Sequence, residues 1–232
     1  MSATSVLELI DKRKQVIKNP HYKQQIKRGL QSFKNSFVHC IDELIIYRNA
    51  LMKLEKLLNE FYLNNGVPEN GGIAYDSFNV KVWFINIPFP NPKFRKDVIH
   101  IHDIEHILNN CDTSSKGEAF IAGWEIGTRF YKHFPINIII FLAFGYFLWS
   151  HPKTVFKGFK KGLNTIGIID LGLTKSELIK MEFNQLVEIT KKKHAKMGIS
   201  QLTEFIFCTF ISQIIILFPL ILIITGLIYV FE

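Results

Sequence analysis

A long run without charge near the C-terminus limits the possible folds of this sequence more than any other feature. No Asp, Glu, Lys or Arg occurs between Phe205 and Phe231. As an α-helix rising about 1.5 Å per residue, this run would reach roughly 40 Å, which exceeds the hydrocarbon thickness of a bilayer. A helix buried in a soluble core is the alternative, but such helices rarely continue so far without a charge. We therefore predict a transmembrane helix here, with Pro219 as the site of a kink.

The rest of the chain fits a single domain on one side of that helix. At 232 residues the sequence has room for one domain and one membrane element. We expect residues 1–200 to form a helical domain and residues 201–232 to form the membrane segment. Lys191–Lys193 and Lys196 precede the apolar run, and only Glu232 follows it. The positive-inside rule then puts the body on the cytoplasmic side of a membrane, expected to be a bacterial inner membrane, with a single-pass C-terminal anchor.

Charge and cysteine content narrow the classes of partner. The formal net charge is +8, and basic clusters at Lys157–Lys161 and Lys191–Lys193 suit nucleic acid or anionic lipid. Lipid is the better interpretation beside a strongly apolar segment, and because no nucleic-acid-binding motif is present we expect no nucleic-acid partner. Cys40, Cys111 and Cys208 lie far apart without a CxxC pair, which argues against a disulfide framework and against a cysteine zinc site.

Hydrophobic spacing predicts an all-α body. Apolar residues recur three and four positions apart through most of the chain, as they do on the buried face of a helix. The expected helices cover residues 2–18, two segments within 21–64, residues 94–110, a helix from 117 onward leading into the apolar run 134–149, and two segments within 153–197, separated by residues 167–172. At about 24 Å the run 134–149 is short for a bilayer crossing, and we interpret it as a buried or half-inserted helix.

Residues 66–97 break the helical pattern. Four prolines and the pair Gly71–Gly72 interrupt any long element in this region. We expect a loop with one short helix near Ala74–Phe78. A short strand over Asn79–Ile87 is the alternative, although prolines bound it closely.

Two histidines one helical turn apart mark the stretch with the most chemistry. His102 and His106 share one face of the predicted helix, and apolar residues fall on the opposite face. Neutral imidazole and carboxylate are usual ligands of Zn²⁺, Fe²⁺ and Mn²⁺. Asp103 lies three positions before His106, and Glu105 lies three positions after His102. Spacing alone therefore leaves open which acid binds a metal and which supports a ligand.

A metal site here needs a further ligand from elsewhere in the chain. Glu118 is the first candidate because it opens the next predicted helix after a polar turn, and Asp112 and Glu125 are its rivals. The alternative is that these histidines and acids are surface residues of an amphipathic helix. The pattern is not the HExxH of zinc proteases. It shares a His-Asp pair with HD phosphohydrolases, but the surrounding sequence offers no support for the further ligands of that class.

The spacing of these residues resembles a known signature. His102-Asp103-x-x-His106, followed after eleven residues by Glu118, is similar to the HDxxH-x11-E signature of the coenzyme Q biosynthesis protein 4 family. Further similar stretches are Gly71–Tyr75, Gly117–Ala119, Lys157–Gly162 and Met197–Ile199. The likeness covers roughly residues 30–200 and is specific only around the signature.

The resemblance implies an all-helical fold and a divalent metal ion, Zn or Mg, bound by His102, Asp103, His106 and Glu118. Glu105 is then left to support a ligand or to face solvent. The resemblance also implies a membrane-associated lyase of ubiquinone biosynthesis, which removes the C1 carboxylate oxidatively from a polyprenylated ring derived from 4-hydroxybenzoate. The implied partners are a polyprenylated quinone precursor, membrane lipid and other enzymes of the pathway, with a homodimer as a further expectation.

The charge-free C-terminal segment departs from that family, whose members attach to membranes peripherally. A built-in anchor suits a lipid substrate, and it also allows a divergent member that handles a different lipid. Two other functions stay open. One is a non-catalytic lipid-binding scaffold that organises quinone-biosynthesis enzymes, and the other is a metal-dependent hydrolase of a lipid or phosphate ester.

Overall fold

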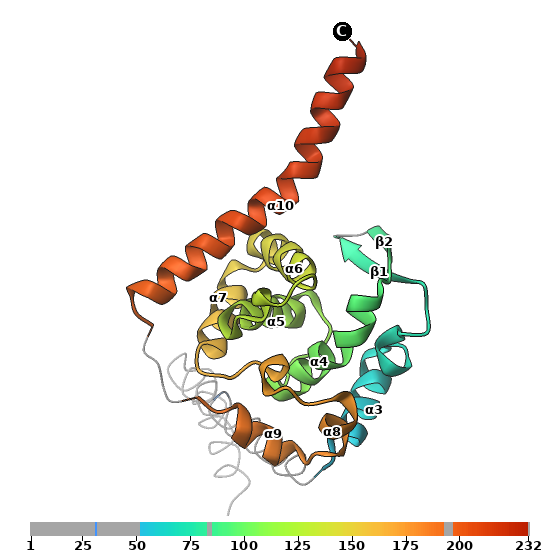
Figure 1. Ribbon diagram of the computed structural model, residues 1–232, viewed down its shortest axis with the longest axis vertical. Coiled ribbons are helices and arrows are strands. Elements are labelled where there is room, and N and C mark those ends of the chain that lie inside the picture. The colour runs from blue at the N-terminus through green and yellow to red at the C-terminus, as the bar shows by residue number, and fades with distance from the viewer. Residues whose placement is uncertain (1–30, 32–51, 83–84, 193–196, 232) are drawn as a thin grey trace, which may run out of the picture. The chain divides into compact units, whose positions relative to one another are not determined.

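The computed structural model describes residues 31, 52–82, 85–192 and 197–231 (Figure 1). These residues, Gln31 excepted, belong to one compact unit, Leu51–Glu232. The helix predicted over residues 2–18 lies outside the described residues, as do nearly all residues before Met52 of the helical segments predicted within 21–64.

The described part of the chain is mostly helical, which confirms the predicted fold class. It contains eight α-helices, three short 3-10 turns and one two-stranded sheet. The helices are α3 (Leu54–Asn65), α4 (Lys93–Asn109), α5 (Ser115–Thr128), α6 (Asn137–Ser150), α7 (Pro152–Gly162), α8 (Lys175–Lys180), α9 (Phe183–Thr190) and α10 (Ile199–Phe231). The 3-10 turns are Glu69–Gly72, Phe130–Lys132 and Ile168–Leu171.

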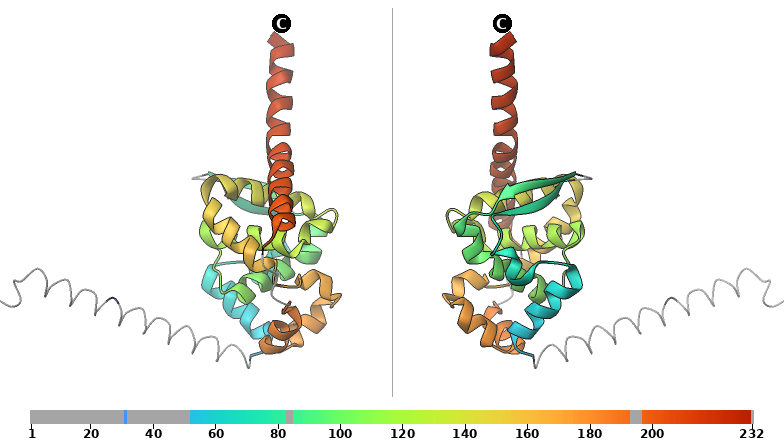
Figure 2. Two further views of the ribbon diagram at one scale, coloured as in Figure 1. Left: turned by 90° about the vertical axis from the view of Figure 1, so that its left-hand side faces the viewer. Right: turned by 90° about the vertical axis from the view of Figure 1, so that its right-hand side faces the viewer.

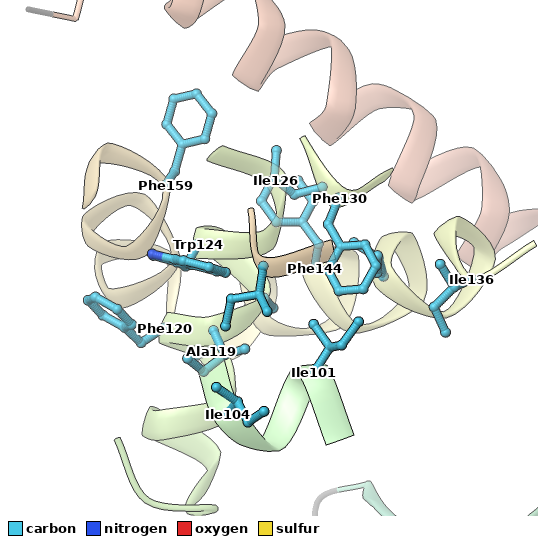
Figure 3. Packing of buried hydrophobic residues seen from close by; sticks show 14 of the residues in the cluster. Ile101, Ile104, Ala119, Phe120, Trp124, Ile126, Phe130, Ile136, Phe144 and Phe159 are labelled. Atoms are coloured by element: carbon cyan, nitrogen blue, oxygen red, sulfur yellow. The ribbon is translucent and has the colours of Figure 1, made fainter. Parts of the chain in front are cut away.

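Helix α5 forms the centre of the unit and packs against α4, α6 and α7 (Figures 1 and 3). It is apolar on nearly all sides, as expected of a helix that neighbours surround. Trp124 and Ile126 of α5 are completely buried. Ile104 of α4 is also completely buried and Ile101 nearly so, and both belong to the same hydrophobic core (Figure 3). The predicted apolar face of α4 is therefore the face that enters the core.

Glycines allow α5 and α7 to touch backbone to backbone. The contact is lined at a spacing of four by Gly123 and Gly127 on α5 and by Gly158 and Gly162 on α7. A Cβ atom on Gly123 would lie 1.9 Å from the carbonyl oxygen of Val155, and one on Gly158 would lie 2.0 Å from that of Phe120. No larger residue fits at either position unless the helices separate. This contact fixes α5, which carries Glu118 and Glu125.

A β-hairpin replaces the loop and short helix predicted for residues 66–97. Strand β1 (Ser77–Val82) pairs antiparallel with β2 (Ile85–Pro90), and Phe78 lies opposite Phe89. The short helix predicted near Ala74–Phe78 is wrong. The sheet has two strands, so both are edge strands. Proline lacks a backbone N–H, and edge strands tolerate it because one side of each has no neighbouring strand to bond. Prolines therefore did not exclude a strand here.

Two further predicted boundaries are wrong. The helix expected to run from residue 117 into the apolar run ends at Thr128, because Arg129 adopts a left-handed conformation with φ 70°. Residues 152–192 form three short helices rather than two. Thr174 and Glu177 make a reciprocal capping box that starts α8. The backbone N–H of Phe183 then donates to Met52, and the bridge between Glu182 and Lys53 separates α8 from α9.

Helix α10 is the one helix among the described residues that is long and apolar enough to cross a membrane. Its first half packs against α6, and its second half leaves the rest of the unit (Figure 1). Arg129 holds the start of α10 through two hydrogen bonds to the carboxylate of Glu204, at 2.8 and 2.9 Å. The indole N–H of Trp149 donates to Gln213 at 2.7 Å, so the most polar residue of the apolar run is paired with the end of α6. Pro219 lies inside the helix. The kink expected at this residue stays a prediction.

Candidate metal centre

Local capping brings Glu118 to the start of α5. Ser114 is the N-cap residue, and its hydroxyl oxygen accepts a hydrogen bond from the backbone N–H of Gly117 at 3.3 Å. The same hydroxyl donates to Asp112 at 2.6 Å. A Cβ atom on Gly117 would lie 1.9 Å from the carbonyl oxygen of Asp112, so the tight turn requires glycine there. The next residue, Glu118, therefore lies in the first turn of α5 and faces α4.

Three predicted ligands converge between α4 and α5. The Nε2 atoms of His102 and His106 lie 3.3 Å apart. Glu118 places Oε1 3.3 Å from Nε2 of His106 and Oε2 3.5 Å from Nε2 of His102. A tetrahedral metal with bonds of 2.0–2.1 Å separates its ligand atoms by about 3.3 Å. The three side chains thus lie close enough together to hold a metal ion, with Glu118 reaching each histidine through a different oxygen.

The donor set and its exposure suit a metal that also binds substrate. Two imidazole nitrogens and one glutamate oxygen are a known ligand set of catalytic zinc, in which the fourth position takes water or substrate. His106 is 1% exposed, whereas His102 is 28% and Glu118 30% exposed. One side of the cluster therefore opens to solvent. Nδ1 of His106 has no hydrogen-bond partner among the residues that the structure describes.

The three groups are also electrostatically coupled. Burial by itself would lower the pKa of His102, but hydrogen bonds and charge interactions with Glu118 and Glu125 raise this pKa well above its usual value. Burial by itself would raise the pKa of Glu118, but both histidines lower this pKa far below its usual range. Without a metal, the cluster therefore favours a protonated His102 beside an ionised Glu118. A divalent cation would take the place of that proton.

Asp103, the fourth predicted ligand, points elsewhere. Its Oδ2 atom accepts a hydrogen bond from the hydroxyl of Tyr62 on α3 at 3.0 Å, and the side chain is 4% exposed. Gly71 lies against the same oxygen, because a Cβ atom there would approach it to 2.7 Å. Burial raises the pKa of Asp103, although His102 and the Tyr62 hydroxyl act against that rise. The structure therefore brings together His102, His106 and Glu118 and holds Asp103 outside this group.

Glu125 and Glu105 form a second carboxylate layer behind His102. Oε1 of Glu125 lies 3.0 Å from Nδ1 of His102. Glu105 is completely buried, so it does not face solvent, and neither of its oxygens has a hydrogen-bond donor within the described part of the chain. Burial and the neighbouring Glu125 raise the pKa of Glu105 well above its usual value, which favours a neutral carboxyl group. A carboxylate on Nδ1 fixes the ring orientation and leaves Nε2 available to a metal.

Sequence spacing found some of these residues and missed others. The sequence offers Glu125 only as a rival ligand and does not indicate its contact with Nδ1 of His102. This contact depends on the packing of α5 against α4. Tyr62 lies 41 residues before Asp103. Its only sequence signal is a place in the apolar pattern of α3, so its hydroxyl could not be assigned to the site. Asp112, the other rival, serves the capping turn.

In comparisons with known proteins, no family model, no curated protein and no solved structure matches this chain. The likeness to the coenzyme Q biosynthesis protein 4 family therefore depends on the signature and the other stretches quoted from the sequence.

Proposed function

We propose that this chain is a membrane-anchored, metal-dependent protein that acts on a lipid. The carrying observation is the convergence of His102, His106 and Glu118, whose ligand atoms lie 3.3–3.5 Å apart and open to solvent on one side. A cluster of surface residues would not need one imidazole to be 1% exposed or another to be held by a buried carboxylate. The donor types favour a divalent ion, with zinc the best match to two histidines and a glutamate.

In this proposal each side chain has a separate part. His102 and His106 offer neutral nitrogen, and Glu118 offers a negative charge that reduces the cost of holding a dication. Glu125 orients His102 through Nδ1. When bound, a divalent metal acts as a Lewis acid toward a carboxylate or another substrate oxygen. Asp103 remains a proposed fourth ligand, suggested by the signature, and binding through it would require its oxygen to leave Tyr62.

The proposed substrate is the polyprenylated aromatic acid that the signature suggests, a precursor of ubiquinone. Helix α10 supports a lipid substrate, because it is apolar and long enough to hold the body at a membrane. In the proposal, the body lies on the cytoplasmic side and the reaction removes the ring carboxylate oxidatively. Zinc and magnesium ions do not accept electrons in this reaction, so an external acceptor such as O₂ is required.

Complementation with single-site variants tests this function. In a strain lacking the gene, the unaltered chain should restore quinone levels, whereas His106→Ala and Glu118→Gln should not. His133→Ala is the matched control, because His133 pairs with Asp170 at 2.9 Å outside the cluster. Full rescue by both cluster variants, together with loss of bound metal, would exclude metal-dependent catalysis. Such rescue would favour the non-catalytic scaffold.

A lipid analysis of the purified protein separates the pathway from the site. The unaltered protein is extracted from membranes, and the lipid that co-purifies with it is identified by mass spectrometry. This lipid should be a prenylated aromatic acid. A phospholipid or phosphate ester that accumulates in the Glu118→Gln variant would instead favour a metal-dependent hydrolase. The metal site would survive that result, while the quinone assignment would not.

A further inference from the structure

The part of α10 that could cross a membrane includes turns that pack on the rest of the unit. Ile211, Ile215 and Ile216 still contact the body, and Ser212 is completely buried against Gly145 of α6. Helix α10 is long and apolar enough to cross a membrane over Ile199–Tyr229. This span includes the turns that pack on α6. Helix α6 then has to enter the membrane with them.

The exposed surface of α6 and of the first half of α10 suits lipid. Helix α6 contains no charged residue. Ile138 and Leu142 of α6 are 45% and 38% exposed, and Phe207 and Phe210 of α10 are more exposed than either. Trp149 at the end of α6 is 71% exposed, in the position of an interfacial aromatic residue. In water these side chains would leave large apolar groups exposed, as on an interaction surface.

The hairpin carries a second exposed apolar face at the same end of the unit. Ile85, Ile87 and Phe89 alternate along β2, so they project from one face, and all three are 37–53% exposed. Both views in Figure 2 show the hairpin near the level of α6, at the end from which α10 leaves, with α8 and α9 at the opposite end. A lone two-stranded sheet is marginal in water. A lipid environment would cover its apolar face.

Charge marks where this surface stops. The ion pair of Arg129 with Glu204 lies immediately before the charge-free run of α10. After the hairpin, charged residues return at the start of α4, where Lys93 pairs with Asp97 at 2.7 Å. Such pairs belong in water or among lipid head groups rather than in hydrocarbon. Between these pairs, α6 has no charged residue and the hairpin has one, Lys81 of β1. Helix α6 packs against the charge-free run of α10, which favours lipid over a protein partner.

We infer that α6, the hairpin β1–β2 and the first half of α10 form a membrane face that lies within the lipid bilayer. The inference rests on the proposed crossing of the membrane by α10. This inference adds that part of the helical body itself enters the bilayer, in addition to the α10 helix that anchors it. Helix α4 begins directly after the hairpin, so the helix that carries His102 and His106 starts at the lipid surface.

Site-specific quenching by lipid tests the membrane face in the full chain. Single cysteines are introduced by Ile87→Cys on β2 and Leu142→Cys on α6, after replacement of the three native cysteines. Ile189→Cys on α9 is the matched control, because this isoleucine is 41% exposed at the opposite end of the unit. Ile224→Cys reports on the α10 crossing. Each protein carries one fluorophore and is placed in phosphatidylcholine–phosphatidylglycerol vesicles whose acyl chains are brominated.

The membrane face predicts several-fold stronger quenching by brominated lipid at positions 87 and 142 than at 189, with position 224 quenched as well. A soluble quencher such as iodide should show the reverse order. Quenching at 224, with positions 87 and 142 behaving like 189, would overturn the membrane face and leave the α10 crossing intact. Loss of lipid quenching at 224 would remove the crossing and the membrane face together. The labelled positions are exposed, so their replacement should leave the fold intact, which circular dichroism checks.

Discussion

Nδ1 of His102 on α4 lies 3.0 Å from Oε1 of Glu125 on α5, and Nε2 of the same ring faces His106 and Glu118. One imidazole thus separates a supporting carboxylate from the open cluster. A proton on Nδ1, donated to Glu125, leaves a lone pair on Nε2 for a metal. The functional proposal depends on these separate roles of the two ring nitrogens.

Replacing the supporting carboxylate should weaken metal binding without abolishing it. Glu125→Gln keeps the size of the side chain and removes its charge, so His102 becomes a poorer ligand. We expect the dissociation constant for zinc to rise by about 10- to 100-fold, as for other carboxylates that support a metal-bound histidine. Competition with a zinc-binding dye measures this, with Glu55→Gln on the exposed side of α3 as the control. An unchanged affinity would show that Glu125 does not act through His102.

Metal affinity should rise with pH beyond the ordinary range of histidine. Although burial opposes it, Glu118 and Glu125 raise the pKa of His102 well above its usual value, so a proton competes with the metal until the pH exceeds this raised pKa. Glu118 has a pKa far below its usual range and stays ionised throughout. Titrations should run from pH 5.5 to 9, which is roughly one unit below to two and a half units above the usual histidine pKa near 6.5. The metal affinity should still increase above pH 6.5. A plateau at or below pH 6.5 would contradict the coupling.

The glycine contact between α5 and α7 should be intolerant of a single methyl group. Gly123→Ala places a Cβ atom 1.9 Å from the carbonyl oxygen of Val155, which forces the two helices apart. We expect a loss of roughly 1–3 kcal/mol in the free energy of unfolding, as for other overpacked cores. Gly226→Ala on α10 is the control, because nothing lies within 4 Å of the added atom. Chemical denaturation in detergent compares the two variants, and equal stabilities would refute the close contact.

Charges within α10 should prevent stable membrane insertion. Each arginine near the centre of a transmembrane helix raises the free energy of membrane insertion by about 2.5–3.5 kcal/mol. The double variant Ile221→Arg and Ile224→Arg should therefore move from the membrane fraction that resists alkaline extraction into the alkaline extract. Leu63→Arg on α3 is the control, since this leucine is 82% exposed outside α10. Retention of the double variant in the membrane fraction would show that α10 is not the anchor.

Local patterns predicted much of the site and less of its surroundings. Helical period placed His102 and His106 on one face of α4 and put Ile101 and Ile104 in the core, because these relations involve neighbours on a single helix. The role of Tyr62 depends on how α3 packs against α4, which local period does not encode. Glu118 was the first candidate for a further ligand because it opens the next predicted helix, and the signature supported this choice. The geometry brings that residue to both histidines.

Three errors outside the site have separate physical origins. The prolines of β2 suggested a loop, but a hairpin with two edge strands tolerates them. The left-handed residue Arg129 ends α5 without a glycine or proline to announce it. The break between α8 and α9 follows from the distant pairing of Glu182 with Lys53. A distant contact therefore sets this last boundary, whereas the hairpin and the end of α5 depend on local strand pairing and backbone conformation.

Metal content of the purified full chain tests the central claim most directly. Inductively coupled plasma mass spectrometry of protein extracted without chelator should find close to one divalent metal ion per chain. His106→Ala and Glu118→Gln should lower this content to background, whereas His133→Ala should leave it unchanged. An unaltered chain that folds with normal stability, holds no metal and takes up none from added zinc would contradict the metal centre and the function proposed from it.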